Sequence, residues 1–157
     1  MAIITKSIDD QDEINYVWEN GARGFLAQRQ IPGCFNENSL YVNGTKGDAT
    51  LTRGSRITDL ATGKRWKYDG EDPNMYQVEH DEFFASIRSG KPINDGDRMI
   101  QSTLMAIMGR MAGYSGQKIT WDQALASEEK LVPEFTKGWD SPVEFRRIPV
   151  PGTFEQV

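Results

Sequence analysis

The sequence has little of what most catalytic and metal sites are built from. It contains one cysteine, Cys34, and one histidine, His80. A lone cysteine excludes an internal disulfide, and a lone histidine excludes a metal site with two imidazole ligands. No run of about 18 apolar residues occurs, and the N-terminal apolar run is too short for a signal peptide. We therefore expect no membrane partner and a cytoplasmic location.

An excess of positive charge is also missing. The formal net charge is −5, and nine of the 18 basic residues and nine of the 23 acidic residues lie in residues 1–70. The acidic excess therefore falls entirely in residues 71–157. Nucleic-acid binding depends largely on cations that neutralise phosphates, so we expect no nucleic-acid partner.

The length and composition are those of one globular domain. The chain has 157 residues, of which 38% are hydrophobic and 26% are charged. We expect a single domain over residues 1–157, with mainly strands and hairpins in 1–70 and a helical hairpin with a short strand and helix in 71–127. Four prolines in residues 128–157 exclude regular helix and central strand there, which predicts an extended tail.

Two successive helices organise the pattern. Apolar residues recur at the same helical spacing in both: Tyr76, His80, Phe83, Phe84 and Ile87 in the first, and Ile100, Leu104, Ile107, Met108 and Met111 in the second. Each helix therefore carries one apolar stripe that needs a partner surface. Gly90 suits the left-handed position after the first helix, and Asn94 is a possible N-cap of the second. Residues 118–120 predict a short strand, and Thr120 with Gln123 predicts a capping box that opens a helix through Ala126.

Three hairpins precede the helices. Asn20-Gly21 favours a two-residue turn, which would pair Trp18 with Arg23, Tyr16 with Phe25, Ile14 with Ala27 and Asp12 with Arg29. Residues 40–43 and 49–53 predict a second hairpin around a turn at 44–47. Residues 56–60 and 64–68 predict a third, with Trp66 and Tyr68 on one face. The expected fold class is α+β, an open and mostly antiparallel sheet with helices packed on one face.

Few residues are candidates for chemistry. His80 lies on the apolar stripe of its helix, and a partly buried histidine held by a backbone or carboxylate partner explains it better than catalysis does. The functional alternative places Tyr76 and His80, one turn apart, at a pocket. Arg29 and Gln30 end a strand beside a turn where side chains often reach a cleft, although a cross-strand pair with Asp12 explains Arg29 more simply.

Other apparent motifs have structural explanations. Lys46 lies in a Gly-Thr-Lys-Gly stretch between two strands, which is a hairpin turn and not a phosphate loop. Gly109 and Gly113, with Ala106 and Ala112, give the second helix a smooth face for close packing. From the residues alone we can assemble no complete active site. We assign no catalytic residue, no metal site and no cofactor site.

The longer pattern resembles a known family. Seven stretches of the chain are together similar to the C-terminal domain of the Gfo/Idh/MocA oxidoreductases, a family named for glucose-fructose oxidoreductase and inositol dehydrogenase. These stretches are Arg29 to Cys34, Gly44 to Gly47, Met75 to Phe84, Ser86 to Asn94, Ser102 to Ala112, Tyr114 to Gly116 and Ile119 to Ala124. The resemblance covers roughly residues 21–127 and extends to the proline-rich tail. It implies an open-sheet domain that shapes a substrate site and forms an oligomer interface.

The resemblance covers only part of such an enzyme. The family's Rossmann domain, with its Gly-x-Gly-x-x-Gly fingerprint, is absent here, as are the motifs that carry its catalytic Lys, Asp and His. His80 belongs to a later helix than the family's catalytic histidine. The resemblance therefore implies no cofactor in this chain and NAD(P) only in a full-length parent, where this domain would help to position a sugar-like small molecule.

We therefore expect the C-terminal substrate-site and oligomerisation domain of an NAD(P)-dependent sugar or polyol oxidoreductase, inactive in isolation. Whether the chain counts as an enzyme is left open. Homo-oligomerisation through the open sheet face is expected, since residues such as Val17, Leu26 and Leu40 need cover. The alternative is a free-standing dimerising module without catalysis. A third, weaker interpretation is a sugar-active lyase or isomerase that uses Tyr76, His80 and neighbouring carboxylates.

Overall fold

The computed structural model describes residues 2–8, 11–52, 54–131 and 150–152. These fall into two compact units, each described here by itself. The sheet–helix unit comprises Met1–Pro32 with Asp95–Val157, and the hairpin unit comprises Gly33–Asn94. The α+β class with open antiparallel sheets is confirmed, but the described strands form two four-stranded sheets instead of the one expected. The expected single domain stays a prediction.

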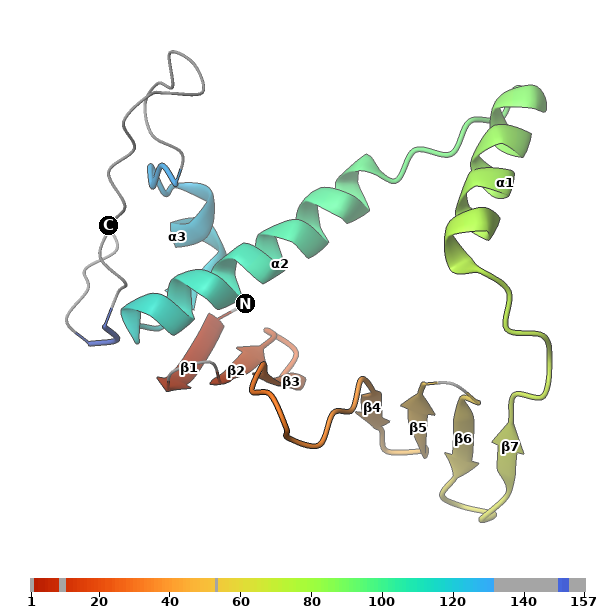
Figure 1. Cartoon of the computed structure of the whole chain (residues 1–157), viewed down its shortest axis with the longest axis horizontal. Coiled ribbons are helices and arrows are strands. Elements are labelled where there is room, and N and C mark those ends of the chain that lie inside the picture. The colour runs from red at the N-terminus through yellow and green to blue at the C-terminus, as the bar shows by residue number, and fades with distance from the viewer. Residues whose placement is uncertain (1, 9–10, 53, 132–149, 153–157) are drawn as a thin grey trace. The chain divides into compact units, whose positions relative to one another are not determined.

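The sheet–helix unit contains an antiparallel sheet in the order β3-β2-β1-β8, of which β1, β2 and β3 are labelled in Figure 1. Its strands are β1 (Ala2–Ile8), β2 (Gln11–Val17), β3 (Arg23–Arg29) and β8 (Ile119–Thr120). Strand β1 was not predicted. It pairs with β2 over its whole length and with β8 at Ala2 and Ile3, so it joins the N-terminal hairpin to the segment after the helices.

The β2–β3 hairpin has a different register from the predicted one. Ile14 pairs with Leu26 and Tyr16 with Gly24, one residue away from the expected partners. The reason is the loop: the Trp18 amide donates to the Ala22 carbonyl, the Gly21 amide donates to the Trp18 carbonyl, and Gly21 has a φ of 85°. A three-residue loop with glycine in the left-handed region replaces the two-residue turn.

The shift changes which side chains share a face. Phe25 was expected beside Tyr16 but pairs with Asn15, and its side chain is 77% exposed. Leu26 takes the place beside Ile14. At Gly24 an added Cβ would lie 3.0 Å from the Trp18 ring, so the missing side chain lets that ring cover the strand.

Helix α2 (Gly96–Ser115) packs against β1 and β2. Its buried residues lie in its C-terminal half, where Met108, Met111 and Ala112 join Ile14, Tyr16, Ile119 and Ala124 in the core. Of the predicted stripe, Met108 and Met111 are buried, whereas Ile100 and Ile107 are exposed. The N-cap is Asp95, not Asn94, and its carboxylate pairs with Arg98 at 3.0 Å.

The segment after α2 follows the prediction closely. Gly116 ends the helix with a φ of 67°, β8 follows, and α3 (Trp121–Leu125) begins at the predicted capping box of Thr120 and Gln123. Of the predicted tail, residues 132–149 and 153–157 lie outside the described residues. At its described part, the Gly152 amide donates to the Ser115 carbonyl at 2.9 Å, next to the end of α2.

The hairpin unit contains the sheet β4-β5-β6-β7, built from Leu40–Asn43, Gly47–Leu51, Arg56–Asp59 and Arg65–Lys67. Both hairpins form about the predicted turns. The register places six large apolar residues on one face, each between 44% and 57% exposed: Leu40, Val42, Leu51, Ile57, Trp66 and Tyr68. We call this set the apolar sheet face. The Trp66 and Tyr68 rings lie 6.3 Å apart, as their predicted common face requires.

Helix α1 (Met75–Arg88) completes the hairpin unit. The Asn74 side chain caps it by accepting from the Tyr76 and Gln77 amides. At its end Gly90 has a φ of 70°, and the Gly90 and Lys91 amides donate to the Ile87 and Ser86 carbonyls, a Schellman motif that confirms the predicted role of Gly90. Because α1 and α2 belong to different units, the expected helical hairpin stays a prediction.

Candidate functional site

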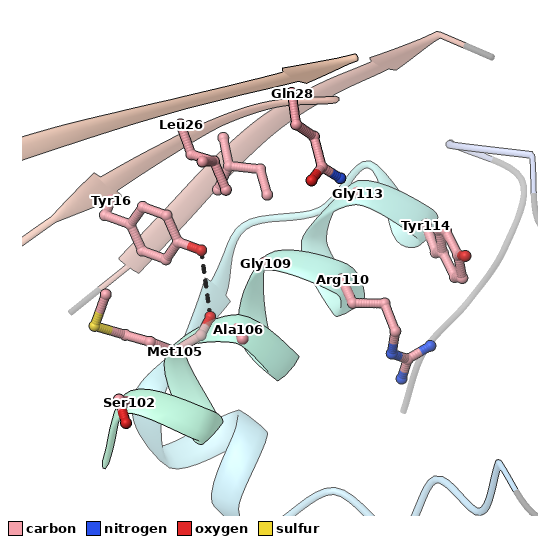
Figure 2. A pocket seen from close by; sticks show the side chains of 11 residues that line it. Tyr16, Leu26, Gln28, Ser102, Met105, Ala106, Gly109, Arg110, Gly113 and Tyr114 are labelled. Carbon is pink, nitrogen blue, oxygen red and sulfur yellow. Dashed lines mark hydrogen bonds between the residues drawn. The ribbon is translucent and has the colours of Figure 1, made fainter. Parts of the chain in front are cut away.

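A groove of about 470 Å³ lies between α2 and strands β2 and β3. We call it the α2 groove (Figure 2). The sheet contributes alternating residues of the two strands, and α2 contributes residues one turn apart. Its lining is Ile14, Tyr16, Leu26, Gln28, Ser102, Met105, Ala106, Gly109, Arg110, Gly113 and Tyr114. Most of these side chains are small or apolar, which is typical of a small-molecule site.

Gly109 lets the sheet approach α2 beside the groove. A Cβ at Gly109 would lie 2.7 Å from the Tyr16 hydroxyl oxygen and 3.0 Å from Ile14 Cδ1. The Tyr16 hydroxyl donates a long hydrogen bond of 3.4 Å to the Met105 carbonyl (Figure 2). Burial raises the pKa of Tyr16, because the phenolate would lose solvation there. Tyr16 therefore stays a neutral phenol well above neutral pH.

Arg110 is the charged residue of the lining. Its guanidinium pairs with the Glu129 carboxylate from the segment after α3 and lies 5.5 Å from the centre of the Tyr114 ring. The Arg110 and Glu129 side chains are 26% and 15% exposed. Figure 2 shows Gln28 reaching from the sheet toward α2, and Arg110 extending from α2 beside Tyr114. The groove thus has an apolar floor and, at one end, a guanidinium that is already paired with a carboxylate.

The described lining of the groove has the parts of a binding site and no complete catalytic set. Its polar groups are an amide, three hydroxyls and a guanidinium, and none of them forms a nucleophile–base pair. Within the described residues, no three His, Cys, Asp or Glu side chains gather into a group that could hold a metal ion. The described helices also include none that is long and apolar enough to span a membrane.

None of the four predicted site residues lines the α2 groove. Arg29 and Gln30 are exposed at the end of β3, and Arg29 is opposite Gln11, so the predicted pair with Asp12 is wrong by one residue. The structure places Arg29 and Gln30 in one unit and Tyr76 and His80 in the other, and it does not bring the two pairs together.

His80 is exposed, so its expected partial burial is wrong. Its expected backbone partner is present. Nδ1 lies 2.7 Å from the Tyr76 carbonyl oxygen, which only accepts, so the Nδ1 proton must be donated there. The Phe84 ring lies 6.4 Å away. The hydrogen bond from Nδ1 orients the imidazole along its own helix.

The residues that build the groove were only partly visible in the sequence. The smooth face of α2 was noted as a packing feature, and Ile14 and Tyr16 were expected on one apolar face. Gln28 and Arg110 were missed. The signal that could have found them is an arginine directly after Gly109 on the smooth helix face, combined with the correct strand register.

The comparisons with known proteins add no relative. No family model matches the chain, and neither a curated protein nor a solved structure does.

Proposed function

We propose that this chain is the substrate-side and assembly domain of an NAD(P)-dependent sugar or polyol oxidoreductase of the Gfo/Idh/MocA type. In such an enzyme a separate Rossmann domain would bind the cofactor and supply the catalytic groups. This chain would help to enclose the sugar-like substrate and would join subunits. By itself it would be catalytically silent.

The elements between residues 75 and 126 support the proposal. They run in the order helix α1, a turn that starts at Gly90, helix α2, strand β8 and the capped helix α3. The residues that carry the family resemblance fall at the caps of these elements as well as within them. Gly90 has a positive φ, and Thr120 and Gln123 form the capping box. The resemblance is therefore consistent with the local structure in which its residues lie.

The apolar sheet face carries the proposal of assembly. Six large apolar side chains on one side of a four-stranded sheet remain between 44% and 57% exposed. Contiguous apolar patches of this kind mark interaction surfaces in proteins that stay dissolved. A two-fold interface buries the same patch on both copies, so one face can supply both halves of a dimer.

A second open face adds support. On the side of the β3-β2-β1-β8 sheet away from Ile14 and Tyr16, Phe25 is 77% exposed and offers apolar surface to another chain. Leu26, which was expected to need cover from another subunit, is 42% exposed and lines the α2 groove.

The test is the molar mass of the whole chain in solution by light scattering, measured with and without NAD(H), alongside a fluorescence titration of the cofactor. A dimer or larger species that ignores the cofactor is expected. Cofactor binding at micromolar concentration would contradict the proposal, since it would require a nucleotide site in this chain. A strict monomer would contradict its assembly role.

The alternative is a free-standing dimerising module without catalysis, which the apolar sheet face equally favours. Ligand-observed NMR with a panel of sugars and polyols separates the two proposals. Binding of at least one of them supports a substrate-side role. A dimer that binds none of them supports the module.

A further inference from the structure

We propose that the α2 groove binds a small monocarboxylate with an apolar body, and that its carboxylate replaces Glu129 on Arg110. The site lies on the α2 side of the β3-β2-β1-β8 sheet, not on either face assigned to assembly. This binding proposal can therefore succeed or fail independently of the proposed function.

The size and floor of the groove set the body of the ligand. A volume of about 470 Å³ is within the range of small-molecule sites. Ile14, Leu26 and Met105 supply apolar surface from both sides. Ala106, on the α2 side, leaves room where a larger residue would fill the space. An aliphatic or aromatic body fits this lining because it buries apolar surface without leaving polar groups unpaired.

The charge of the lining sets the head group. Arg110 is the single charged residue among the eleven described residues that line the groove, so an anion is favoured over a cation once Glu129 is displaced. A guanidinium binds a carboxylate through two parallel hydrogen bonds, which suits a carboxylate better than an alcohol. The Tyr114 ring, 5.5 Å from the guanidinium carbon, restricts the orientation of Arg110 before any ligand arrives.

Glu129 shows that a carboxylate fits on Arg110. It reaches Arg110 from a segment outside the lining, and both side chains keep contact with solvent. The pair is mostly buried, so the exchange requires the ligand carboxylate to keep Arg110 paired while Glu129 moves its charge into solvent. A ligand that also buries its apolar body in the groove gains the free energy of that burial. Glu129 does not gain it, because it lies outside the lining.

The test compares octanoate, 1-octanol and octylamine on the full chain, with binding followed through the ¹³C-methyl signals of Ile14 and Met105. These probes share one apolar body and differ in head group. Octanoate should shift both methyl signals and bind about tenfold more tightly than 1-octanol, with octylamine weakest. Equal affinities for octanoate and 1-octanol, or no change at either methyl, would overturn the proposal.

Three variants locate the head group. Glu129→Gln should strengthen octanoate binding about threefold or more, because it removes the competing carboxylate, and should leave 1-octanol unchanged. Arg110→Gln should reduce the affinity for octanoate to the affinity for 1-octanol. Arg98→Gln, on the same helix and paired with Asp95, is the matched control and should change neither. If Arg110→Gln does not fold, Glu129→Gln still decides: an unchanged octanoate affinity would refute the exchange.

Discussion

Tyr16 and Gly109 show how one residue pair fixes the distance between a sheet and a helix. The Tyr16 ring is buried against α2, and its hydroxyl oxygen lies where a side chain at position 109 would begin. Glycine normally weakens a helix by about 1 kcal/mol relative to alanine. Here it permits a contact that buries Tyr16 and Ile14.

Gly109→Ala should therefore destabilise the fold by about 1–3 kcal/mol, although alanine is the better helix former. The added Cβ would stand 2.7 Å from the Tyr16 oxygen and 3.0 Å from Ile14 Cδ1, and the buried tyrosine has little room to move. Urea unfolding measures the change. The same substitution in a Tyr16→Phe background should cost less, because the nearest atom is gone. A stabilising Gly109→Ala would show that the contact is looser than described.

Asp59 holds the turn between β6 and β7. Its Oδ1 accepts from the Thr62 amide at 2.7 Å and the Thr62 hydroxyl at 2.8 Å, and these bonds lower the pKa of Asp59. A carboxyl with a lowered pKa contributes stability that is present above its unfolded pKa and is lost as the pH falls through its folded pKa.

We expect NMR titration of the Asp59 carboxyl to give a pKa below the ordinary value of 3.8, with the turn loosening as the group protonates. Amide exchange at Thr62 reports the loosening. Asp59→Asn keeps an acceptor oxygen and should remove the acid dependence of that exchange while preserving the hairpin. An Asp59 pKa at or above 3.8 would contradict the prediction.

At the scale of elements, the β2–β3 hairpin depends on its loop. A single left-handed residue, Gly21, ends the three-residue loop and sets which residues of the two strands are opposite each other. Since side chains alternate across a strand, a shift of one residue changes which partners share each face. Leu26 and Gln28 line the α2 groove because of this loop.

Gly21→Ala should destabilise the protein by about 1–2 kcal/mol, since the left-handed conformation is costly for residues with a Cβ. No atom lies within 4 Å of the added Cβ, so the cost is that of the backbone alone. Gly21→Asn is the matched control and should cost less, because asparagine tolerates this region. Thermal unfolding measures both, and equal melting temperatures for wild type and Gly21→Ala would be inconsistent with the loop.

At the scale of the whole molecule, the apolar sheet face makes a prediction about assembly. Ile57 lies on that face, and Thr58, the next residue of β6, lies on the opposite, polar face. Ile57→Glu places a charge in the proposed interface and should lower the molar mass in light scattering to that of a monomer. Thr58→Glu should leave the assembly intact. If both variants dissociate, or neither does, the apolar sheet face is not the interface.

Local signals predicted local structure well. The capping box at Thr120, the left-handed Gly90 and the turns at residues 44–47 and 61–63 each depend on a few consecutive residues. The positions of the helices were also predicted closely, because their spacing repeats along the chain.

The candidate site was harder to predict. Tyr16 and Met105 are 89 residues apart in sequence, and no repeat links them. The exposure of His80 was mispredicted because an apolar stripe shows which side of a helix seeks cover, not whether cover is present. The four predicted site residues were chosen from local context, and the groove is made by a distant contact.

The sequence by itself determined the class of the fold, the two long helices, the left-handed Gly90, the capping box at Thr120 and most of the hairpins, because periodicity and turn chemistry act over a few residues. Only the tertiary structure decided the strand register, the division into two sheets, the pairing of β1 and the α2 groove. These features depend on which surfaces pack against each other in the folded chain, and single residues can change that packing. One glycine in a loop shifts a strand by a residue, and one glycine on a helix admits a tyrosine.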